Sequence, residues 1–139
     1  MTPSTSIQRA EAFAERFGLA LPILMAPMAG ACPAPLAAAV ARAGGLGACG
    51  ALLMQPDAIK AWAKDVRASS NGAFQMNLWI PDPAPVRDAA NEGLLRQFLQ
   101  HWGPDIPDNA ADRPGPDFEA QCAAMLDAGP SIISSIMGV

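Results

Sequence analysis

The stretch Pro22–Gly50 constrains the fold of this chain more than any other. It begins with a short apolar run, Pro22–Met25, which is typical of a strand buried on both faces. A loop of small residues follows, and an alanine-rich helix is predicted over residues 33–43, ended by a pair of glycines. A second apolar strand over 46–49 begins at once. This compact βαβ unit favours parallel strands, because its crossover returns the chain in the same direction.

Two further strands are predicted over 73–78 and 131–135, which gives four strand candidates. Helices are expected over 6–18, from Gln55 onward and from Asp117 or Phe118 to Gly129. The first of these carries Phe13 and Phe17 on one face and is expected to cover the bottom of the sheet, with Ser6 as its cap. The alternation indicates an α/β fold with parallel strands and flanking helices.

The length of the chain limits how much of a barrel it supplies. A closed barrel of eight parallel strands with helices between them needs about 250 residues, whereas this chain has 139 residues and four strand candidates. The chain is therefore long enough for roughly half of such a barrel. A half barrel on its own would present an open apolar edge at its last strand, which favours a fragment of a longer protein.

Residues 81–116 form a proline-rich excursion after the third predicted strand. A helix is predicted over 86–102, with an apolar stripe made of Leu94, Leu95, Phe98, Leu99 and Trp102. In a barrel this position is at the active-site end, where long insertions often shape substrate access. A surface subdomain without ligand contact is the open alternative.

Composition narrows the class of protein. Hydrophobic residues make up 51% of the chain and charged residues 16%, as in a soluble α/β domain. The net charge of −4 and the lack of a Lys/Arg cluster argue against nucleic acid as a partner. No apolar run has the length of a membrane span, so no membrane partner is expected. Three scattered cysteines are typical of reduced thiols, and we expect a cytoplasmic protein.

Four segments in order resemble the nitronate monooxygenase family, formerly called 2-nitropropane dioxygenases. They are APMAG at 26–30, AGGLGACG at 43–50, FQMNLWIP at 74–81 and PSIIS at 130–134. The resemblance covers roughly residues 20–139 and is weakest between 82 and 117. It implies that residues 1–139 are the N-terminal part of one TIM (β/α)8-barrel domain of a longer enzyme, roughly the first half of the barrel. It also implies non-covalently bound FMN and the oxidation of alkyl nitronates or nitroalkanes with dioxygen.

The loop after the first predicted strand is the first candidate cofactor-binding segment. It consists of Ala26, Pro27, Met28 and Ala29. Ligand contacts in barrels come from the carboxyl ends of strands, and small side chains there let a flat ring approach closely. The resemblance implies that this loop touches the flavin. The alternative is a tight turn that merely requires small residues.

Three polar residues at strand ends complete the candidate site. Asn77 lies in an otherwise apolar strand, where a buried amide needs hydrogen-bond partners, and the resemblance implies that it is the FMN-binding asparagine. A loop-bracing amide is its alternative. Gln75 shares its face of the strand, and core packing and flavin contact are both open for it. Ser134 matches a family serine on the fourth strand and is expected to face the barrel mouth.

No catalytic residue is assigned. The family's catalytic histidine lies in an A-G-G-H segment that residues 1–139 lack. His101 is the only histidine, and its place on the excursion favours an ordinary surface side chain. Cys32 and Cys49 are interpreted as packing residues, because no positive charge lies beside them in sequence. Acidic residues lack a compact ligand spacing, so no metal is expected.

The resemblance leaves the reaction and the partners open. An FMN-dependent enoyl reductase or NADH:quinone reductase of the same barrel superfamily is one alternative, and a non-catalytic truncated fragment is another. A second copy of the chain or the remainder of the barrel is the expected protein partner. On its own, the 139-residue chain is expected neither to turn over nitronates nor to bind FMN tightly.

Overall fold

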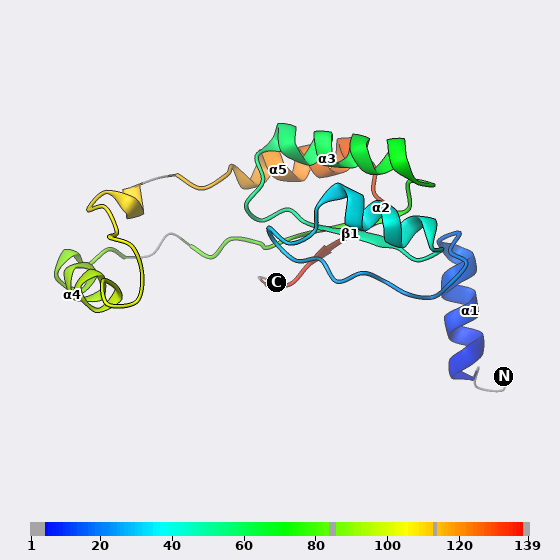
Figure 1. Ribbon diagram of the computed structural model, residues 1–139, viewed down its shortest axis with the longest axis horizontal. Helices are drawn as coiled ribbons and strands as arrows, with labels where there is room; N and C mark the ends of the chain where they lie inside the picture. The colour runs from blue at the N-terminus through cyan, green and yellow to red at the C-terminus, as the bar shows by residue number, and fades with distance from the viewer. Residues whose placement is uncertain (1–4, 84–85, 113, 138–139) are drawn as a thin grey trace. The chain divides into compact units, whose positions relative to one another are not determined.

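The computed structural model describes residues 5–83, 86–112 and 114–137 (Figure 1). The chain divides into two units. The first unit comprises the chain up to Pro81 and from Pro116 onward, and the second unit is Asp82–Gly115. No helix of the described residues is long and apolar enough to cross a membrane.

A parallel sheet with helices on one face forms the first unit. Its strands are β1 (Gly47–Gly50), β2 (Phe74–Leu78) and β3 (Ile132–Ser135), in the order β1-β2-β3. Helix α3 (Pro56–Ser69) connects β1 to β2, and α5 (Phe118–Ala128) precedes β3. The two helices lie side by side over the sheet, and α2 (Ala34–Arg42) packs against α3 and β1 (Figure 1). The predicted parallel strands with flanking helices are therefore confirmed.

The prediction of a first strand buried on both faces is wrong. The segment before α2 makes only two isolated parallel bridges to the β1 region, at Leu24 and Ala29. Ile23 is 57% exposed and Leu24 is 42% exposed. The physical reason is that this segment lies at the edge of the described sheet, where only one neighbouring strand and few backbone hydrogen bonds hold it. Pro22 removes one further amide donor.

The alternation along β2 separates the two faces of the sheet. Phe74, Met76 and Leu78 are buried in the apolar core that α3 and α5 complete. Phe74 also packs edge-on against Trp62 of α3, with ring centroids 5.3 Å apart. Because successive strand residues point to opposite faces, Gln75 lies on the face that these helices do not cover.

A second apolar cluster covers the amino ends of the strands, as predicted. Helix α1 (Ser6–Arg16) brings the rings of Phe13 and Phe17 within 4.8 Å of each other. They pack on residues that precede or begin the strands, namely Leu19, Leu46, Ala73 and Ile132. The predicted cap at Ser6 is wrong, because Thr5 is the N-cap and forms a reciprocal capping box with Gln8.

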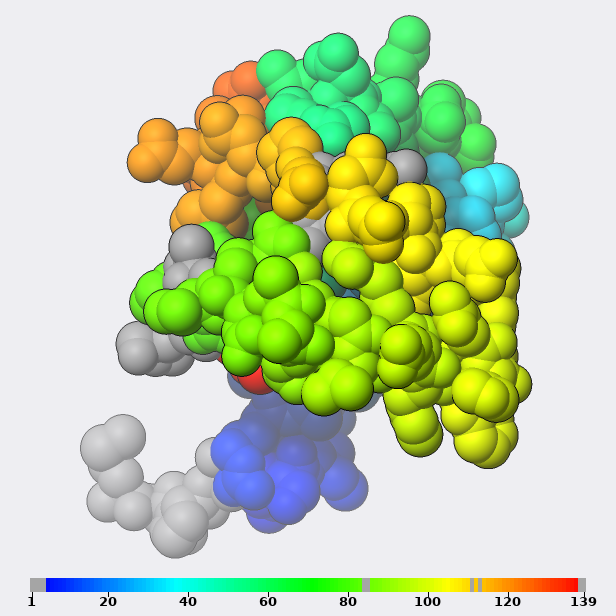
Figure 2. Space-filling view, turned by 90° about the vertical axis from the view of Figure 1, so that its left-hand side faces the viewer, coloured from blue at the N-terminus to red at the C-terminus, as the bar shows by residue number. Residues whose placement is uncertain are grey.

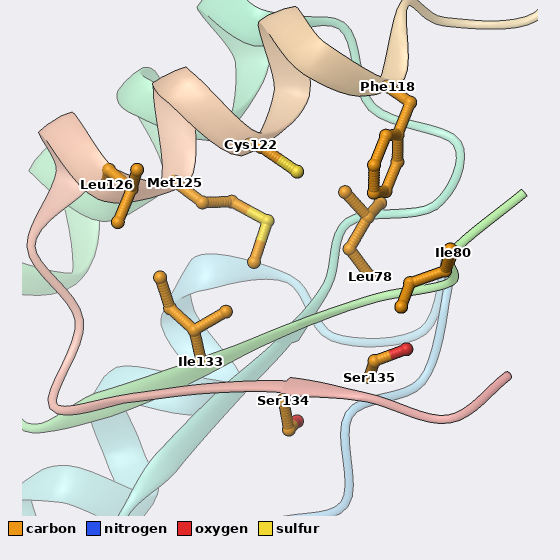
Figure 3. A pocket seen from close by; sticks show the side chains of 9 residues that line it. All are labelled: Leu78, Ile80, Phe118, Cys122, Met125, Leu126, Ile133, Ser134 and Ser135. Carbon is orange, nitrogen blue, oxygen red and sulfur yellow. The ribbon is translucent and has the colours of Figure 1, made fainter. Parts of the chain in front are cut away.

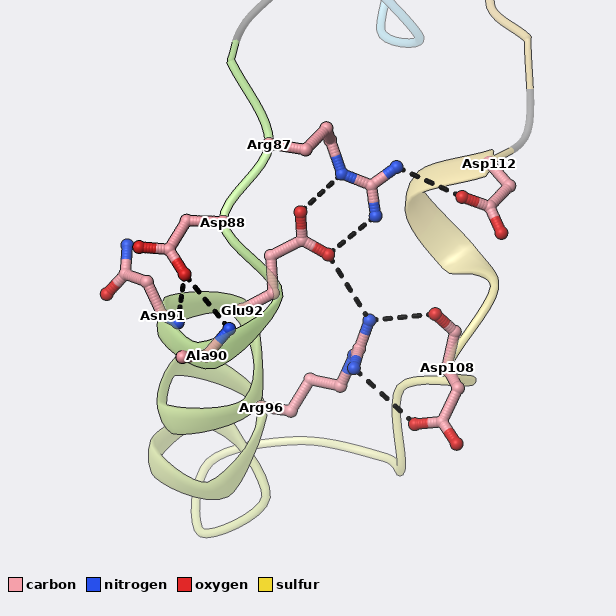
Figure 4. A network of polar contacts seen from close by, with 8 residues as sticks. All are labelled: Arg87, Asp88, Ala90, Asn91, Glu92, Arg96, Asp108 and Asp112. Atoms are coloured by element: carbon pink, nitrogen blue, oxygen red, sulfur yellow. Dashed lines mark hydrogen bonds and ion pairs between the residues drawn. The ribbon is translucent and has the colours of Figure 1, made fainter.

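The second unit is organised by charge. Helix α4 (Ala89–Leu99) is shorter than predicted, since the Asp88 side chain caps its first turn, and a 3-10 turn follows at Ala110–Asp112. Figure 4 shows the ion-pair network that links α4 to this turn, made of Arg87, Glu92, Arg96, Asp108 and Asp112. No residue of α4 is buried. The predicted apolar stripe is exposed throughout the described part of this unit, which forms the yellow-green and yellow surface of Figure 2.

Candidate functional site

Parallel strands place all their carboxyl ends at one edge of the sheet, and the loop at residues 26–30 crosses that edge beside β1. Ala29 bridges to Gly50, the last residue of β1. A Cβ atom at Gly50 would lie 2.6 Å from the backbone nitrogen of Ala29, so only glycine permits this close approach. The predicted loop and the strand ends are therefore brought together.

The side chain of Cys32 holds the 26–29 loop through two hydrogen bonds to its backbone. Cys32 Sγ accepts a hydrogen bond from the Met28 N–H at 3.1 Å and donates to the Ala26 carbonyl at 3.5 Å. The Ala26 and Ala29 side chains are exposed, Pro27 is half-buried and Met28 is 43% exposed. This arrangement fixes the loop while leaving a surface of small residues open to a ligand.

Gln75, Asn77 and Ser134 share the face of the sheet opposite to the helices. Asn77 pairs with Ser134 in the strand register, and its Nδ2 donates to Ser134 Oγ at 3.0 Å. Gln75 Nε2 donates to the Met25 carbonyl at 2.8 Å, which ties β2 to the start of the 26–29 loop. Gln75 thereby braces the loop, and this contact gives its buried amide a hydrogen-bond acceptor.

The Asn77–Ser134 pair has donor and acceptor groups that no described residue of the chain uses. Asn77 is 8% exposed, and within the described residues its side chain makes only the bond to Ser134. Its Oδ1, its second N–H and the Ser134 hydroxyl hydrogen therefore have no protein partner in that part of the chain. The pair can both donate to and accept from a ligand. Neither an amide nor a serine hydroxyl titrates near neutral pH, so the pair is suited to hydrogen bonding with a ligand and not to proton transfer.

Sequence reasoning missed Gln121, a buried glutamine of α5. Its Nε2 lies 3.1 Å from the Ala51 carbonyl, 3.3 Å from that of Leu52 and 2.8 Å from that of Met54. It thus holds the loop that follows β1 at the same edge of the sheet. The signal was present, because Gln121 is one helical turn from Phe118 and Met125 and so shares their apolar face.

Cys49 and His101 are the remaining titratable residues that the sequence singled out. Burial, and secondly the charge of Cys32, raise the pKa of Cys49 to about 12, so this thiol stays protonated at neutral pH. His101 is an exposed residue of the second unit, and its Nδ1 lies 3.1 Å from the Gln97 carbonyl. Within the described ranges, no group of three or more His, Cys, Asp or Glu residues is gathered to hold a metal ion.

An apolar groove of about 410 Å³ lies on the other, helix-covered face (Figure 3). It runs between α5 and the ends of β2 and β3, and its lining includes Phe118, Cys122 and Met125 on one side of α5, as predicted for that helix. Ile133 and Ser135 point from β3 toward α5, whereas Ser134 points to the opposite side of the strand (Figure 3). Ser134 belongs to the lining of the groove, but its side chain points away from α5, so its hydrogen bond with Asn77 lies on the other face of the sheet.

Comparison with known proteins gives a consistent result. The family profile described as nitronate monooxygenase matches residues 11–139. A nitronate monooxygenase from Paraburkholderia phytofirmans is 33% identical over 131 residues, which cover 88% of this chain and 35% of the relative. A nitronate monooxygenase from Pseudomonas aeruginosa is 32% identical over 98 residues, 68% of this chain and 28% of the relative. The chain therefore spans about a third of the length of these curated relatives.

Solved structures extend the comparison to the fold. A nitroalkane oxidase from Streptomyces ansochromogenes superposes with a TM-score of 0.67 at 28% identity, over 89% of this chain and 35% of that one. FabK from Thermotoga maritima superposes with a TM-score of 0.52 at 23% identity, over 91% of this chain and 39% of that one. These likenesses confirm the predicted fold as part of a TIM barrel.

Proposed function

The chain belongs to the nitronate monooxygenase family, and we propose that it supplies the N-terminal part of an FMN-dependent enzyme that oxidises alkyl nitronates with dioxygen. The observation that carries the proposal is the Asn77–Ser134 pair beside the 26–29 loop, at the carboxyl ends of the strands. Ligand sites of barrels are built at this end.

The residues present fit an FMN. Ala26 and Ala29 offer a surface without bulky side chains, against which a flat ring can lie. Asn77 Oδ1 and its second N–H match the alternating donors and acceptors of a flavin edge. When bound, FMN would accept electrons from the nitronate and pass them to dioxygen. The loop and Asn77 would hold it, and the Cys32 and Gln75 contacts would keep the loop in place.

The proposed contribution of this chain is binding and orientation. Gln75, Asn77, Ser134 and the 26–29 loop contain no group that titrates near neutral pH. Proton transfer is therefore not assigned to any of them. His101 belongs to the second unit, and it is not proposed as the base.

A chimera tests the proposal directly. Residues 11–139 replace the matching segment of the Paraburkholderia phytofirmans nitronate monooxygenase, so that the rest of the barrel comes from that relative. FMN content is measured by absorbance after gel filtration, and oxygen uptake is measured with propionate-3-nitronate. We expect bound FMN and nitronate-dependent oxygen uptake.

The same chimera separates the alternatives. Turnover of NADH with a quinone, or of an enoyl substrate, without oxygen uptake on nitronate would replace the proposal by a reductase function. The likeness to FabK shows the shared fold alone and does not favour that outcome. A folded chimera without FMN would indicate that this chain does not contribute a flavin site.

A further inference from the structure

A pocket of about 290 Å³ at the carboxyl end of β1 is rich in sulfur. The chain has three cysteines and seven methionines, and two of each line this pocket: Met28, Cys32, Cys49 and Met54. They come from the loop before α2, from β1 and from the loop after β1. Four sulfur-bearing residues from segments distant in sequence thus line one pocket of the first unit.

The sulfur atoms interact with one another and with the backbone around them. Cys49 Sγ lies 3.5 Å from Met54 Sδ. Both cysteines are buried, and they interact electrostatically, since charge on Cys32 contributes to the raised pKa of Cys49. Cys32 Sγ also accepts a hydrogen bond from the Met28 N–H at 3.1 Å.

Among the described residues, no side chain that lines the pocket carries a carboxylate or an imidazole. Apart from the sulfur-bearing residues, the lining consists of Gly30, Pro33, Gly50, Leu53 and Trp62. Calcium and magnesium require oxygen ligands. Thiolates and thioethers together select soft ions such as copper(I). Zinc sites usually have at least three Cys, His or carboxylate ligands, and the described residues contain no such group. In this pocket, a third ligand beside the two cysteines would have to be a methionine thioether.

We propose that this pocket binds one soft monovalent metal ion, copper(I) or silver(I), through the sulfur atoms of Cys32, Cys49 and Met54. Each coordinating thiol releases its proton to solvent, and Met54 binds as a neutral thioether. The metal keeps its +1 charge, so no oxidant or reductant takes part. Cys32 loses its thiol bond to the Ala26 carbonyl on binding, which couples the ion to the 26–29 loop.

Silver(I) titration of the 139-residue chain tests this site without copper redox chemistry. The titration uses chloride-free buffer and a Cys122→Ser background, which removes the thiol outside the pocket. We expect one equivalent to bind, more tightly as the pH rises, because binding displaces thiol protons. Binding is followed by calorimetry and by native mass spectrometry.

Variants decide which sulfur atoms hold the ion. Cys32→Ala and Cys49→Ala should each weaken binding by more than about 100-fold, and Met54→Leu by about tenfold. Met137→Leu is the matched control, since Met137 is an exposed methionine outside the pocket, and it should bind as the parent does. Circular dichroism confirms folding. Met54→Leu conserves volume and keeps the test valid if a cysteine variant does not fold.

Three results would overturn the proposal. The first is the absence of stoichiometric silver(I) binding by the folded parent. The second is unchanged affinity in the Cys32→Ala, Cys49→Ala double variant or in Met54→Leu. The third is zinc(II) binding as tight as silver(I) binding, because the donor set would then not distinguish soft from borderline ions.

Discussion

Helices with an apolar stripe occur in both units of this chain, but they are stabilised by different contacts. In the first unit, the apolar sides of α3 and α5 are buried against β2, with Phe74 and Met76 fully enclosed. In the second unit, the stripe of α4 is exposed. Ion pairs of half-exposed or exposed side chains, made by Arg87 and Arg96, link the helix and the residue before its cap to Asp108 and Asp112. Helical periodicity predicts a helix in both cases, whereas burial depends on a sheet to pack against.

The largest expected difference between the units is the cost of removing a core ring. Phe74→Ala should lower the free energy of unfolding of the first unit by about 3–5 kcal/mol, because it leaves a cavity beside Trp62. Phe98→Ala in α4 is the matched control and should cost less than about 1 kcal/mol, since that ring is 63% exposed. Urea unfolding followed by tryptophan fluorescence measures both. Equal costs would contradict the distinction between the units.

The second-largest loss of unfolding free energy is expected when the buried amide of Gln121 is removed. Gln121→Met preserves most of the side-chain volume but leaves the carbonyls of the 51–54 loop without their donor. We expect a loss of about 1–3 kcal/mol in unfolding free energy and faster hydrogen exchange in α3 and the loop before it. Gln97→Met, at an exposed position of α4, should be nearly neutral. An equally small effect at both positions would show that the loop does not depend on Gln121.

Acid should act on the second unit first. The hydrogen bond from Arg87 lowers the pKa of Glu92 below its ordinary value of 4.5. A depressed carboxyl pKa contributes stability above the unfolded pKa, and that contribution is lost as the pH falls through the folded pKa. Amide chemical shifts of α4 should therefore change below about pH 4.5, whereas those of β2 should not. In Glu92→Gln the α4 shifts should lose this pH dependence, and a retained dependence would assign it to another carboxylate.

Periodicity and turn residues predicted the parallel strands β1, β2 and β3, the helices between them and the aromatic cover at the amino ends of the strands. They failed at Pro22–Met25, because an apolar run does not reveal whether a strand has neighbours on both sides. They also predicted α4 longer than it is. The helix starts where the Asp88 side chain accepts hydrogen bonds from its first turn, and the spacing of apolar residues gives no information on such a cap.

The candidate site was predicted in part. The shared face of Gln75 and Asn77 follows from the strand period, and the resemblance singled out Ser134. The partner of each amide depends on tertiary geometry, as the bonds from Gln75 to Met25 and from Asn77 to Ser134 show. Contact of these residues with a flavin stays a prediction.

The FMN affinity of the Paraburkholderia chimera, compared between the parent and the Asn77→Ala variant, tests that prediction most directly. Asn77→Ala should weaken FMN binding by about 1–3 kcal/mol, roughly 5- to 150-fold in the dissociation constant, because the flavin loses a preorganised polar partner. Asn91→Ala, at an exposed position of α4, is the matched control and should leave the affinity unchanged. Equal FMN affinity in the parent and in Asn77→Ala, with the fold intact, would show that Asn77 only braces Ser134 and would contradict the proposed flavin site.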